Sequence, residues 1–229
     1  MTPRLIGISS MATRAVLGDL AADFTRRSGT PVAIESVGGV DAAKRVMAGE
    51  AFDVVVLASD AIDQLIEAGR VQAGSKVDLV CSGVAVAVKA GAPIADIGTE
   101  AALRDTVLSA RSIGCSTGPS GVQLLKLFER WGIATQVHDR LLQAPPGVPV
   151  GTLVAQGQVE LGFQQLSELI HVDGLVVLGP MPAAVQISTT FSAGICAGTT
   201  QANEVRRLLD FMASAEADSA KKQHGMMPA

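Results

Sequence analysis

Three short segments of this chain place hydroxyl or glycine residues between an apolar strand and the start of a predicted helix. They are Gly7–Ser10, Ser36–Gly39 and Cys115–Gly121. A helix N-terminus presents unpaired backbone N–H groups and a partial positive charge, so it can bind a small anion. Three such turns predict a cleft that holds an anion without needing a cluster of lysines.

Several residues at these turns could contact the anion directly. Serine and threonine hydroxyls donate hydrogen bonds to a ligand, but they also cap helices routinely, so both roles stay open for each hydroxyl. Arg14 and Lys44 lie near helix starts, where they could pair with carboxylates or remain solvated. The candidate ligand-binding residues at the helix starts are Ser9, Ser10, Thr13, Arg14, Gly38, Gly39, Lys44, Ser59, Thr117 and Ser120.

Other residue types with possible chemistry have simpler interpretations. Asp41 and Asp60 are predicted to be N-terminal helix caps, and Ser59 is a further candidate for such a cap. Cys115 ends an apolar strand and is predicted to behave as a small hydrophobic residue. His171 precedes a predicted turn at Asp173-Gly174 and is predicted to lie at the surface. The three cysteines and three histidines show no metal-ligand spacing, so neither a metal site nor a cofactor is expected.

The composition excludes several classes of partner. With 48% hydrophobic and 17% charged residues, the 229-residue chain is typical of a folded protein large enough for two lobes. A net charge of −4 without a basic run argues against nucleic acid. No apolar stretch approaches the roughly 20 residues of a membrane span, so membrane insertion is not expected. The start of the chain lacks a signal-peptide pattern, which predicts a cytoplasmic protein, or a periplasmic one if a leader has been removed.

Hydrophobic periodicity predicts alternating strands and helices. The run from Asp53 to Ala58 is almost continuously apolar, the pattern of a parallel strand covered on both faces. The strand–helix order from Leu5 to Ala68 therefore predicts a doubly wound parallel sheet. The predicted strands are residues 5–9, 32–37, 53–58, 76–90, 112–116, 159–163, 175–179 and 188–196; the predicted helices are residues 11–27, 40–48, 60–68, 99–110, 119–131, 151–157 and 200–213, followed by a tail helix.

Two long β-rich segments, Lys76–Ala90 and Ser188–Cys196, could each pass from one lobe to another. They bracket an α/β insert. We therefore predict lobe 1 from residues 1–80 and 190–229 and lobe 2 from residues 81–189, with the two crossing segments as a hinge. Ligands of open α/β sheets bind outside the carboxyl ends of the strands, so the three turns are expected to face the interlobe cleft.

At these turns the chain resembles the molybdate-binding proteins of ABC uptake systems. The resemblance spans most of the chain and implies an α/β, two-lobed fold of the type II periplasmic-binding-protein kind, each lobe a doubly wound sheet flanked by helices. It also implies a small anionic ligand and, for a transport protein, an ABC permease as partner. The matching segments are Ser9-Ser10, Val46–Asp60, Ser116–Gly121 and Glu160–Phe163.

Two side-chain donors of that family are missing here. A serine of the second turn contacts the oxyanion in the family, whereas this chain has Gly38 and Gly39. A tyrosine after the late strand is another family ligand, whereas this chain has Gln164 and Gln165 and contains no tyrosine. Each lost donor is costly in a buried site, which disfavours molybdate. The glycines make room for a larger anion, and both glutamine amides can donate to carboxylate oxygens.

The segments Gly7–Arg14 and Gly162–Gln165 are similar to a related enzymatic branch, the aconitate isomerases, which interconvert trans- and cis-aconitate. This resemblance implies a cofactor-independent isomerase that acts on a small unsaturated polycarboxylate by an allylic proton shift. Ser9, Ser10 and Asp41 stay open as candidates for the catalytic base. The alternative is a binding protein that closes on a molybdate-like oxyanion or a small carboxylate and delivers it to an ABC transporter without chemistry.

Overall fold

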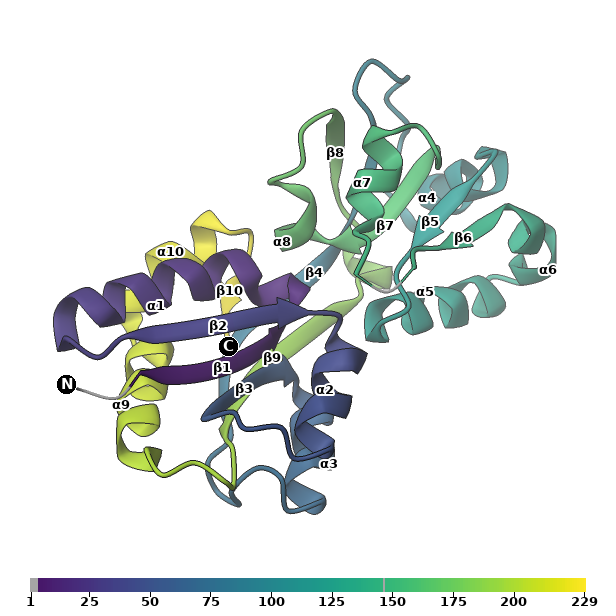
Figure 1. The fold of residues 1–229 in the computed structure, drawn as a ribbon. Helices are drawn as coiled ribbons and strands as arrows, with labels where there is room; N and C mark the ends of the chain where they lie inside the picture. The colour runs from purple at the N-terminus through teal and green to yellow at the C-terminus, as the bar shows by residue number, and fades with distance from the viewer. Residues whose placement is uncertain (1–3, 146) are drawn as a thin grey trace. The chain divides into compact units, whose positions relative to one another are not determined.

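The computed structural model describes residues 4–145 and 147–229. The chain divides into two compact units, here called unit 1 (Met1–Cys81 and Thr190–Ala229) and unit 2 (Ser82–Thr189). Two strands, β4 (Val77–Lys89) and β9 (Ser188–Ile195), run from one unit into the other (Figure 1). No helix in the described part of the chain is long and apolar enough to cross a membrane.

Unit 1 is built on a mixed sheet. Its strand β1 (Leu5–Ser10) lies between β2 (Val32–Val37) and β3 (Val54–Ala58) and is parallel to both. This parallel core confirms the predicted winding of the first three strands. Strand β9 adds antiparallel to β3, β4 lies beside β9, and the short strand β10 (Met227–Pro228) pairs with β4.

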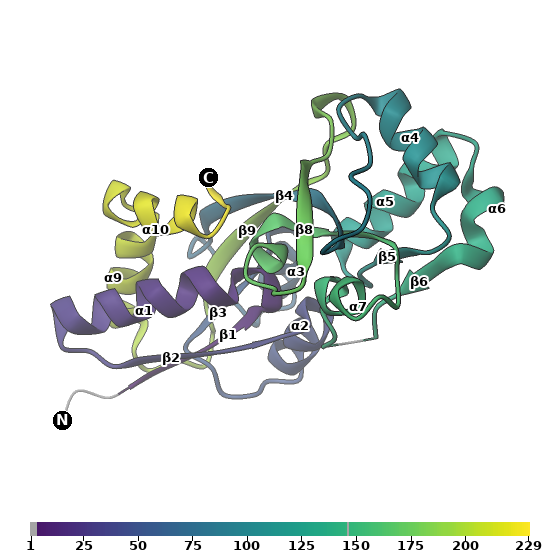
Figure 2. The same ribbon diagram turned by 90° about the horizontal axis from the view of Figure 1, so that it is seen from above.

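Helices cover both faces of the unit 1 sheet (Figures 1 and 2). They span Arg14–Ser28 (α1), Gly39–Met47 (α2), Ser59–Glu67 (α3), Ala202–Ala213 (α9) and Asp218–Gln223 (α10). Strand β3 is buried along its whole length, as predicted. Its residues Val54 and Val56 pack in the core that contains α1 and α9, whereas Val55 and Leu57 pack in the core that contains α2 and α3. Side chains of a strand alternate between faces, so an apolar strand supplies both cores.

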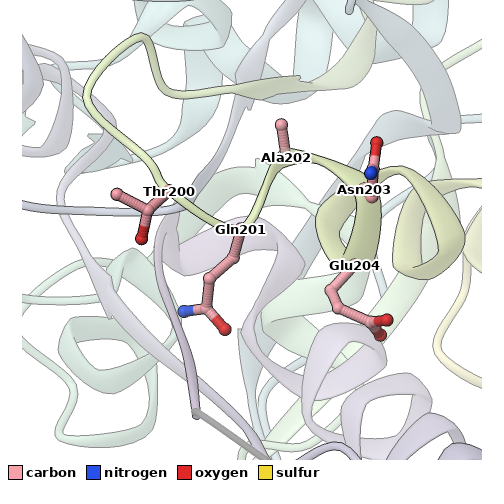
Figure 3. A pocket seen from close by; sticks show the side chains of 5 residues that line it. All are labelled: Thr200, Gln201, Ala202, Asn203 and Glu204. Carbon is pink, nitrogen blue, oxygen red and sulfur yellow. The ribbon is translucent and has the colours of Figure 1, made fainter.

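An open cavity of about 330 Å³ lies in unit 1 and is lined by residues 200–204 (Figure 3). Strand β9 is antiparallel to β3, and Ile195 at its end lies opposite Val54 at the start of β3. The residues that follow β9 therefore leave the sheet at the amino ends of β1 and β3. This cavity lies at the sheet edge opposite to the one where ligands of α/β sheets usually bind.

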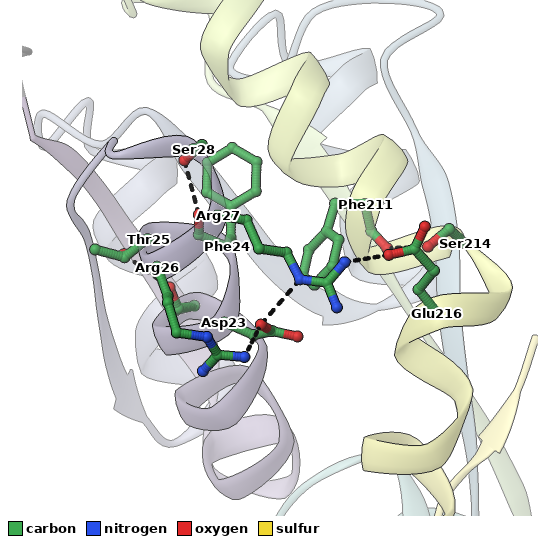
Figure 4. A network of polar contacts seen from close by, with 10 residues as sticks. Asp23, Phe24, Thr25, Arg26, Arg27, Ser28, Phe211, Ser214 and Glu216 are labelled. Atoms are coloured by element: carbon green, nitrogen blue, oxygen red, sulfur yellow. Dashed lines mark hydrogen bonds and ion pairs between the residues drawn. The ribbon is translucent and has the colours of Figure 1, made fainter.

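Helix α1 is tied to the C-terminal segment of unit 1 by a surface network (Figure 4). The Arg27 guanidinium bonds Asp23, with Nε 3.0 Å from Oδ1, and also pairs with Glu216. It lies over the Phe211 ring, 5.3 Å from the ring centroid. Exposed ion pairs contribute little stability, so the cation–π contact and the underlying packing matter more here.

Unit 2 has its own mixed sheet. Strand β5 (Ile113–Cys115) is parallel to β6 (Leu141–Gln143) on one side and to β7 (Leu161–Gln165) on the other. The unit 2 part of β4 is antiparallel both to β7 and to β8 (Leu175–Pro180). The helices span Glu100–Ser109 (α4), Pro119–Arg130 (α5), Ala134–Val137 (α6), Val150–Ala155 (α7) and Leu166–Leu169 (α8).

The observed elements differ from the predicted ones at a few positions. The first helix opens with a 3-10 turn, η1 (Met11–Thr13), so its α-helical part starts at Arg14. Strand β7 is shifted by two residues from the predicted 159–163, because Gln164 and Gln165 pair with β4 and extend the ladder. The short elements α6, β6 and β10 were not predicted, because each has too few residues to show a period.

Candidate functional site

The carboxyl ends of β1, β2 and β3 lie at one edge of the unit 1 sheet, because β1 is parallel to both neighbours. A helical segment begins after each of them: η1 after Ser10, α2 after Gly38 and α3 after Ala58. Three helix N-termini therefore share this edge. Their first N–H groups lack intrahelical acceptors, which makes the edge suited to an anion.

Ser9 and Ser10 end strand β1 and are buried. The hydroxyls of Ser9 and Ser36 are hydrogen-bonded, with their Oγ atoms 2.8 Å apart. The Ser10 hydroxyl has no partner among the described residues, although Ser10 is only 7% exposed. Because a buried hydroxyl without a partner is costly, a ligand oxygen at this edge would stabilise it. Ser10 is the strongest ligand candidate of unit 1.

The glycine pair lies beside Ser10. A Cβ atom on Gly39 would be 3.6 Å from the Ser10 Cβ, which is ordinary contact, and a Cβ on Gly38 would be 3.3 Å from an Asp41 carboxylate oxygen. Gly38 is the N-cap of α2, so the prediction that Asp41 caps this helix is wrong. The helix starts two residues earlier, and Asp41 lies in its first turn, where the helix dipole still favours a carboxylate.

The predicted cap at the start of α3 is also wrong in detail. Ala58 is the N-cap and Ser59 is the first helical residue. The Asp60 carboxylate accepts a hydrogen bond from the backbone N–H of Ala61 at 3.0 Å, but makes no capping bond further along the turn. Ser59 nevertheless lies at the carboxyl end of β3, at the same edge as Ser10.

The remaining unit 1 candidates differ in their contacts. Thr13 is buried, and its hydroxyl donates to the Ser10 carbonyl at 3.1 Å, so it stabilises the turn itself. Arg14 and Lys44 are exposed and make no hydrogen bond or ion pair with the described residues. Unit 1 therefore brings Ser9, Ser10, the glycine pair and Ser59 together at one edge, with two exposed cations on the adjoining helices.

In unit 2 the turn after β5 has the predicted form. Gly118 is the N-cap of α5 and Pro119 is its first residue, where a missing N–H costs nothing. The hydroxyls of Ser116 and Ser120 lie 3.3 Å apart, and Thr117 is exposed. The Thr117 hydroxyl is therefore available to an anion bound over the first turn, whereas the Ser116 and Ser120 hydroxyls contact each other.

Gln164 and Gln165 end β7 and are both 4% exposed. The Gln164 Oε1 accepts from the Gly151 N–H at 2.9 Å, and its Nε2 donates to Glu168 Oε1 at 2.8 Å. The Gln164 amide is thus occupied inside unit 2, so it is not the free ligand donor that the sequence suggested.

The Gln165 amide is only half occupied. Its Nε2 donates to the Thr189 hydroxyl at 2.9 Å, whereas its Oε1 has no partner in residues 4–145 and 147–229. Because a threonine hydroxyl both donates and accepts, turning the amide over would keep this contact and free an N–H donor. Gln165 can therefore offer a ligand either a donor or an acceptor.

Sequence reasoning missed Glu168, the third residue of the short helix α8. Burial raises the pKa of its carboxyl to about 7, an effect larger than the opposing one of the Gln164 hydrogen bond. A carboxyl of this kind can exchange a proton near neutral pH. The sequence does indicate an unusual carboxyl here, because Glu168 stands among segments without charged residues. These segments form the neighbouring elements α7, β7 and β8.

We expect Glu168→Gln to stabilise the protein at high pH. At pH values below 4.5 the carboxyl is protonated in both the folded and the unfolded state, so ionisation costs no stability. Between pH 4.5 and about 7 the unfolded state loses the proton first, which destabilises the folded state by up to about 3 kcal/mol above pH 7. Glutamine cannot ionise, so its gain in urea unfolding should be present at pH 8 and absent at pH 4. The exposed Glu129→Gln is the control; an equal gain at both pH values would contradict this account.

The structure indicates neither a reactive thiol at Cys115 nor a metal-binding cluster among the described residues. Burial raises the pKa of the Cys115 thiol to about 11, so the thiol is not a nucleophile at neutral pH. This agrees with its prediction as a small hydrophobic residue of the unit 2 core. Within residues 4–145 and 147–229, no three His, Cys, Asp or Glu side chains are grouped so as to hold a metal ion.

The two mixed sheets and their connecting strands define the class of this protein, the α/β periplasmic-binding-protein fold. The periplasmic molybdate-binding protein of Azotobacter vinelandii superposes with a TM-score of 0.82 at 20% identity, over 98% of this chain and 99% of that one. The sulfate-binding protein SubI of Mycobacterium tuberculosis H37Rv also gives a TM-score of 0.82, at 17% identity over 100% of this chain and 88% of that one. At these identities the likeness shows the fold, which confirms the predicted fold class.

Residues 6–227 match the family described as bacterial extracellular solute-binding protein, and the chain belongs to that family. A curated relative from Pseudomonas sp is named aconitate isomerase. It is 33% identical over 227 residues, which cover 96% of this chain and 86% of the relative. The predicted resemblance to molybdate-binding-like proteins and to the aconitate isomerase branch is therefore confirmed.

Proposed function

We propose that this protein is a cofactor-independent isomerase that interconverts the cis and trans forms of a small unsaturated polycarboxylate, with aconitate as its substrate. The observation that carries the proposal is the 33% identity to the Pseudomonas aconitate isomerase, which extends over 96% of the chain. The matched length takes in the residues of both units.

The reaction needs a base and a stabilised carbanion. A base removes a proton from the methylene carbon of aconitate, and the negative charge spreads over the allylic carbons and the attached carboxylate. Return of the proton to the former vinyl carbon moves the double bond and permits the other geometry. Helix N-termini and hydroxyl donors stabilise such a developing charge, and each unit, taken by itself, has them at the carboxyl edge of its sheet.

The side chains at these edges support a carboxylate ligand. Gly39 leaves space beside Ser10, and the Ser10 hydroxyl, which has no partner among the described residues, offers a donor. Gln165 can turn its amide to a carboxylate oxygen without losing Thr189. The exposed Arg14, the first residue of α1, adds positive charge near the same unit 1 edge. Lys44 lies in the last turn of α2, so the prediction that it lies near its helix start is wrong.

The direct test is to incubate the purified protein with trans-aconitate in D2O and follow the cis isomer by NMR. Turnover with deuterium entering the methylene or vinyl position supports a proton shift. Molybdate, tungstate and sulfate are compared with both aconitates in parallel thermal-shift assays. No turnover, together with a large shift from molybdate alone, would overturn the isomerase.

The alternative is a non-enzymatic solute-binding protein that delivers an oxyanion or small carboxylate to an ABC permease. The family match and the fold shared with molybdate- and sulfate-binding proteins favour it. Against molybdate stand the absent tyrosine and the glycines at the second turn. Tight binding of aconitate without turnover would support this alternative.

We expect Gly39→Ala to fold normally but to bind substrate more weakly. The added Cβ has room beside Ser10, and alanine favours the helix start, so stability should not fall. The same methyl group narrows the space beside the Ser10 Cβ at this helix start, so the KM for trans-aconitate should rise about tenfold, a cost of roughly 1.4 kcal/mol. Gly18→Ala is the matched control, since nothing lies within 4 Å of a Cβ there. Unchanged KM with unchanged stability would place the ligand away from Gly39.

A further inference from the structure

Glu168 lies where unit 2 would hold a ligand. Strand β7 ends at Gln165 and α8 begins at the next residue, so Glu168 is at the carboxyl end of β7. Strand β5 is parallel to β7, which places the start of α5 at the same sheet edge. A helix start suited to a carboxylate and a group suited to proton transfer therefore share one edge of one unit.

The Glu168 carboxylate is held in one orientation. The Gly151 N–H donates to Gln164 Oε1, which fixes the amide so that its Nε2 donates to Glu168 Oε1. The other carboxylate oxygen of Glu168 has no hydrogen-bond partner in the described part of the chain, and the residue is partly exposed. One oxygen is thus anchored, and the second is available to a substrate C–H group.

Among the described residues, no cation is paired with the Glu168 carboxylate. The elements packed around α8 are α7, β7, β8 and β4, and the first three contain no charged residue. The charges of β4 are Asp78, in unit 1, and Lys89, whose ammonium lies near Gly157. His171 and Asp173 follow α8 in the chain. Burial among apolar neighbours therefore controls the proton affinity of Glu168.

We propose that Glu168 is the residue that carries the proton in the isomerisation, an inference that rests on the proposed function. Ionised Glu168 takes a proton from the methylene carbon, and the C–H electron pair becomes part of the new C=C bond. The electron pair of the old C=C bond then takes the proton back from the Glu168 carboxyl at the far carbon. Glu168 ends ionised, and no oxidant or reductant is needed.

The other candidate bases are less suited to this step. A serine hydroxyl removes a proton only when a neighbouring base activates it. The Ser9 hydroxyl contacts the Ser36 hydroxyl and the Ser10 carbonyl, neither of which is such a base. The Ser10 hydroxyl has no partner in the described residues. Asp41 lies in the first turn of α2, where its carboxylate is beside Gly38.

The test compares wild type, Glu168→Gln and Glu168→Asp in the trans-aconitate assay, with Glu129→Gln as a matched unit 2 control. We expect kcat to fall 10²- to 10⁴-fold in Glu168→Gln while aconitate binding by calorimetry stays within about threefold. Glu168→Asp should keep part of the activity, because it retains a carboxyl. Wild-type kcat/KM should fall as the pH drops below about 7, since the protonated carboxyl cannot accept a proton.

The outcomes separate the two proposals. If wild type shows no turnover, the isomerase function fails and the role of Glu168 with it. If wild type turns over and folded Glu168→Gln keeps kcat within threefold, the isomerase stands and Glu168 is not the base. If Glu168→Gln does not fold, the Glu168→Asp variant is the test. An unchanged kcat with an unchanged pH profile would overturn the role of Glu168. A lowered kcat, together with a shift in the low-pH side of the kcat/KM profile, would support it.

Discussion

Replacing Gly121 with alanine is expected to destabilise the protein by about 3 kcal/mol or more, one of the largest effects of any single substitution in this chain. A Cβ atom at this position would lie 1.8 Å from the Ser116 carbonyl oxygen and 2.8 Å from its carbon. These are backbone atoms, so no rotation of a side chain can relieve the overlap. The turn between β5 and α5 would have to move as a whole, and the N-terminus of α5 would move with it.

Urea unfolding measures the stability of Gly121→Ala, and Gly118→Ala is its matched control. Gly118 lies in the same turn with an extended backbone, φ −78° and ψ −175°, which any residue adopts. A Cβ there would meet only the Ser116 hydroxyl, at 3.7 Å. Because Gly118 is the N-cap of α5, where alanine is less favourable than glycine, we expect the control to lose only about 1 kcal/mol. Equal stability of the two variants would show that the turn is not packed as described.

The second large effect is expected for Phe128→Ala, with a loss of about 3–5 kcal/mol. Phe128 lies on α5 and is 1% exposed in the unit 2 core. Its ring stacks on Trp131 with centroids 5.9 Å apart and meets the edge of the Phe163 ring at 6.2 Å. Truncation removes these contacts and leaves a cavity between α5 and β7, which a close-packed interior fills only in part.

The control for Phe128→Ala is Val122→Ala on the same helix. Val122 is 45% exposed, so its truncation should change stability by no more than about 0.5 kcal/mol. Because Phe163 lies on β7 just before Gln164, the Phe128 variant should also lower turnover by disturbing the end of that strand. A Phe128→Ala protein that unfolds at the wild-type urea concentration would contradict the packing described for unit 2.

Most elements of the fold could be predicted from the chain. Strand β3 was recognised because an unbroken run of valine and leucine is buried on both faces, and α5 because Pro119 and an amphipathic pattern mark its start and its face. The short strand β6 could not be found, since Leu141–Gln143 is recruited only by pairing with β5. Strand β7 was misplaced for the same reason, because its glutamines enter the sheet through β4.

The site was predicted in part. The hydroxyl and glycine turns at Ser9, Ser10, Gly38 and Gly39 do meet at one sheet edge, because parallel strands end together. The predictions that Asp41, Asp60 or Ser59 caps its helix are wrong, because the N-cap of α2 lies three residues before Asp41 and the N-cap of α3 lies one residue before Ser59. The sequence alone cannot tell a capping hydroxyl from a free one, since both use the same residues.

The order of strands and helices, the hydroxyl-rich turns and the absence of tyrosine are properties of the sequence, because periodicity and residue type are local. Tertiary structure alone decided that the Ser10 hydroxyl lacks a partner among the described residues, that both ends of the Gln164 amide are occupied and that only one end of the Gln165 amide is. It also decided that Glu168 holds its proton up to about pH 7. Hydrogen-bond partners and desolvation depend on which distant segments pack around a side chain, and that is fixed only when the chain has folded.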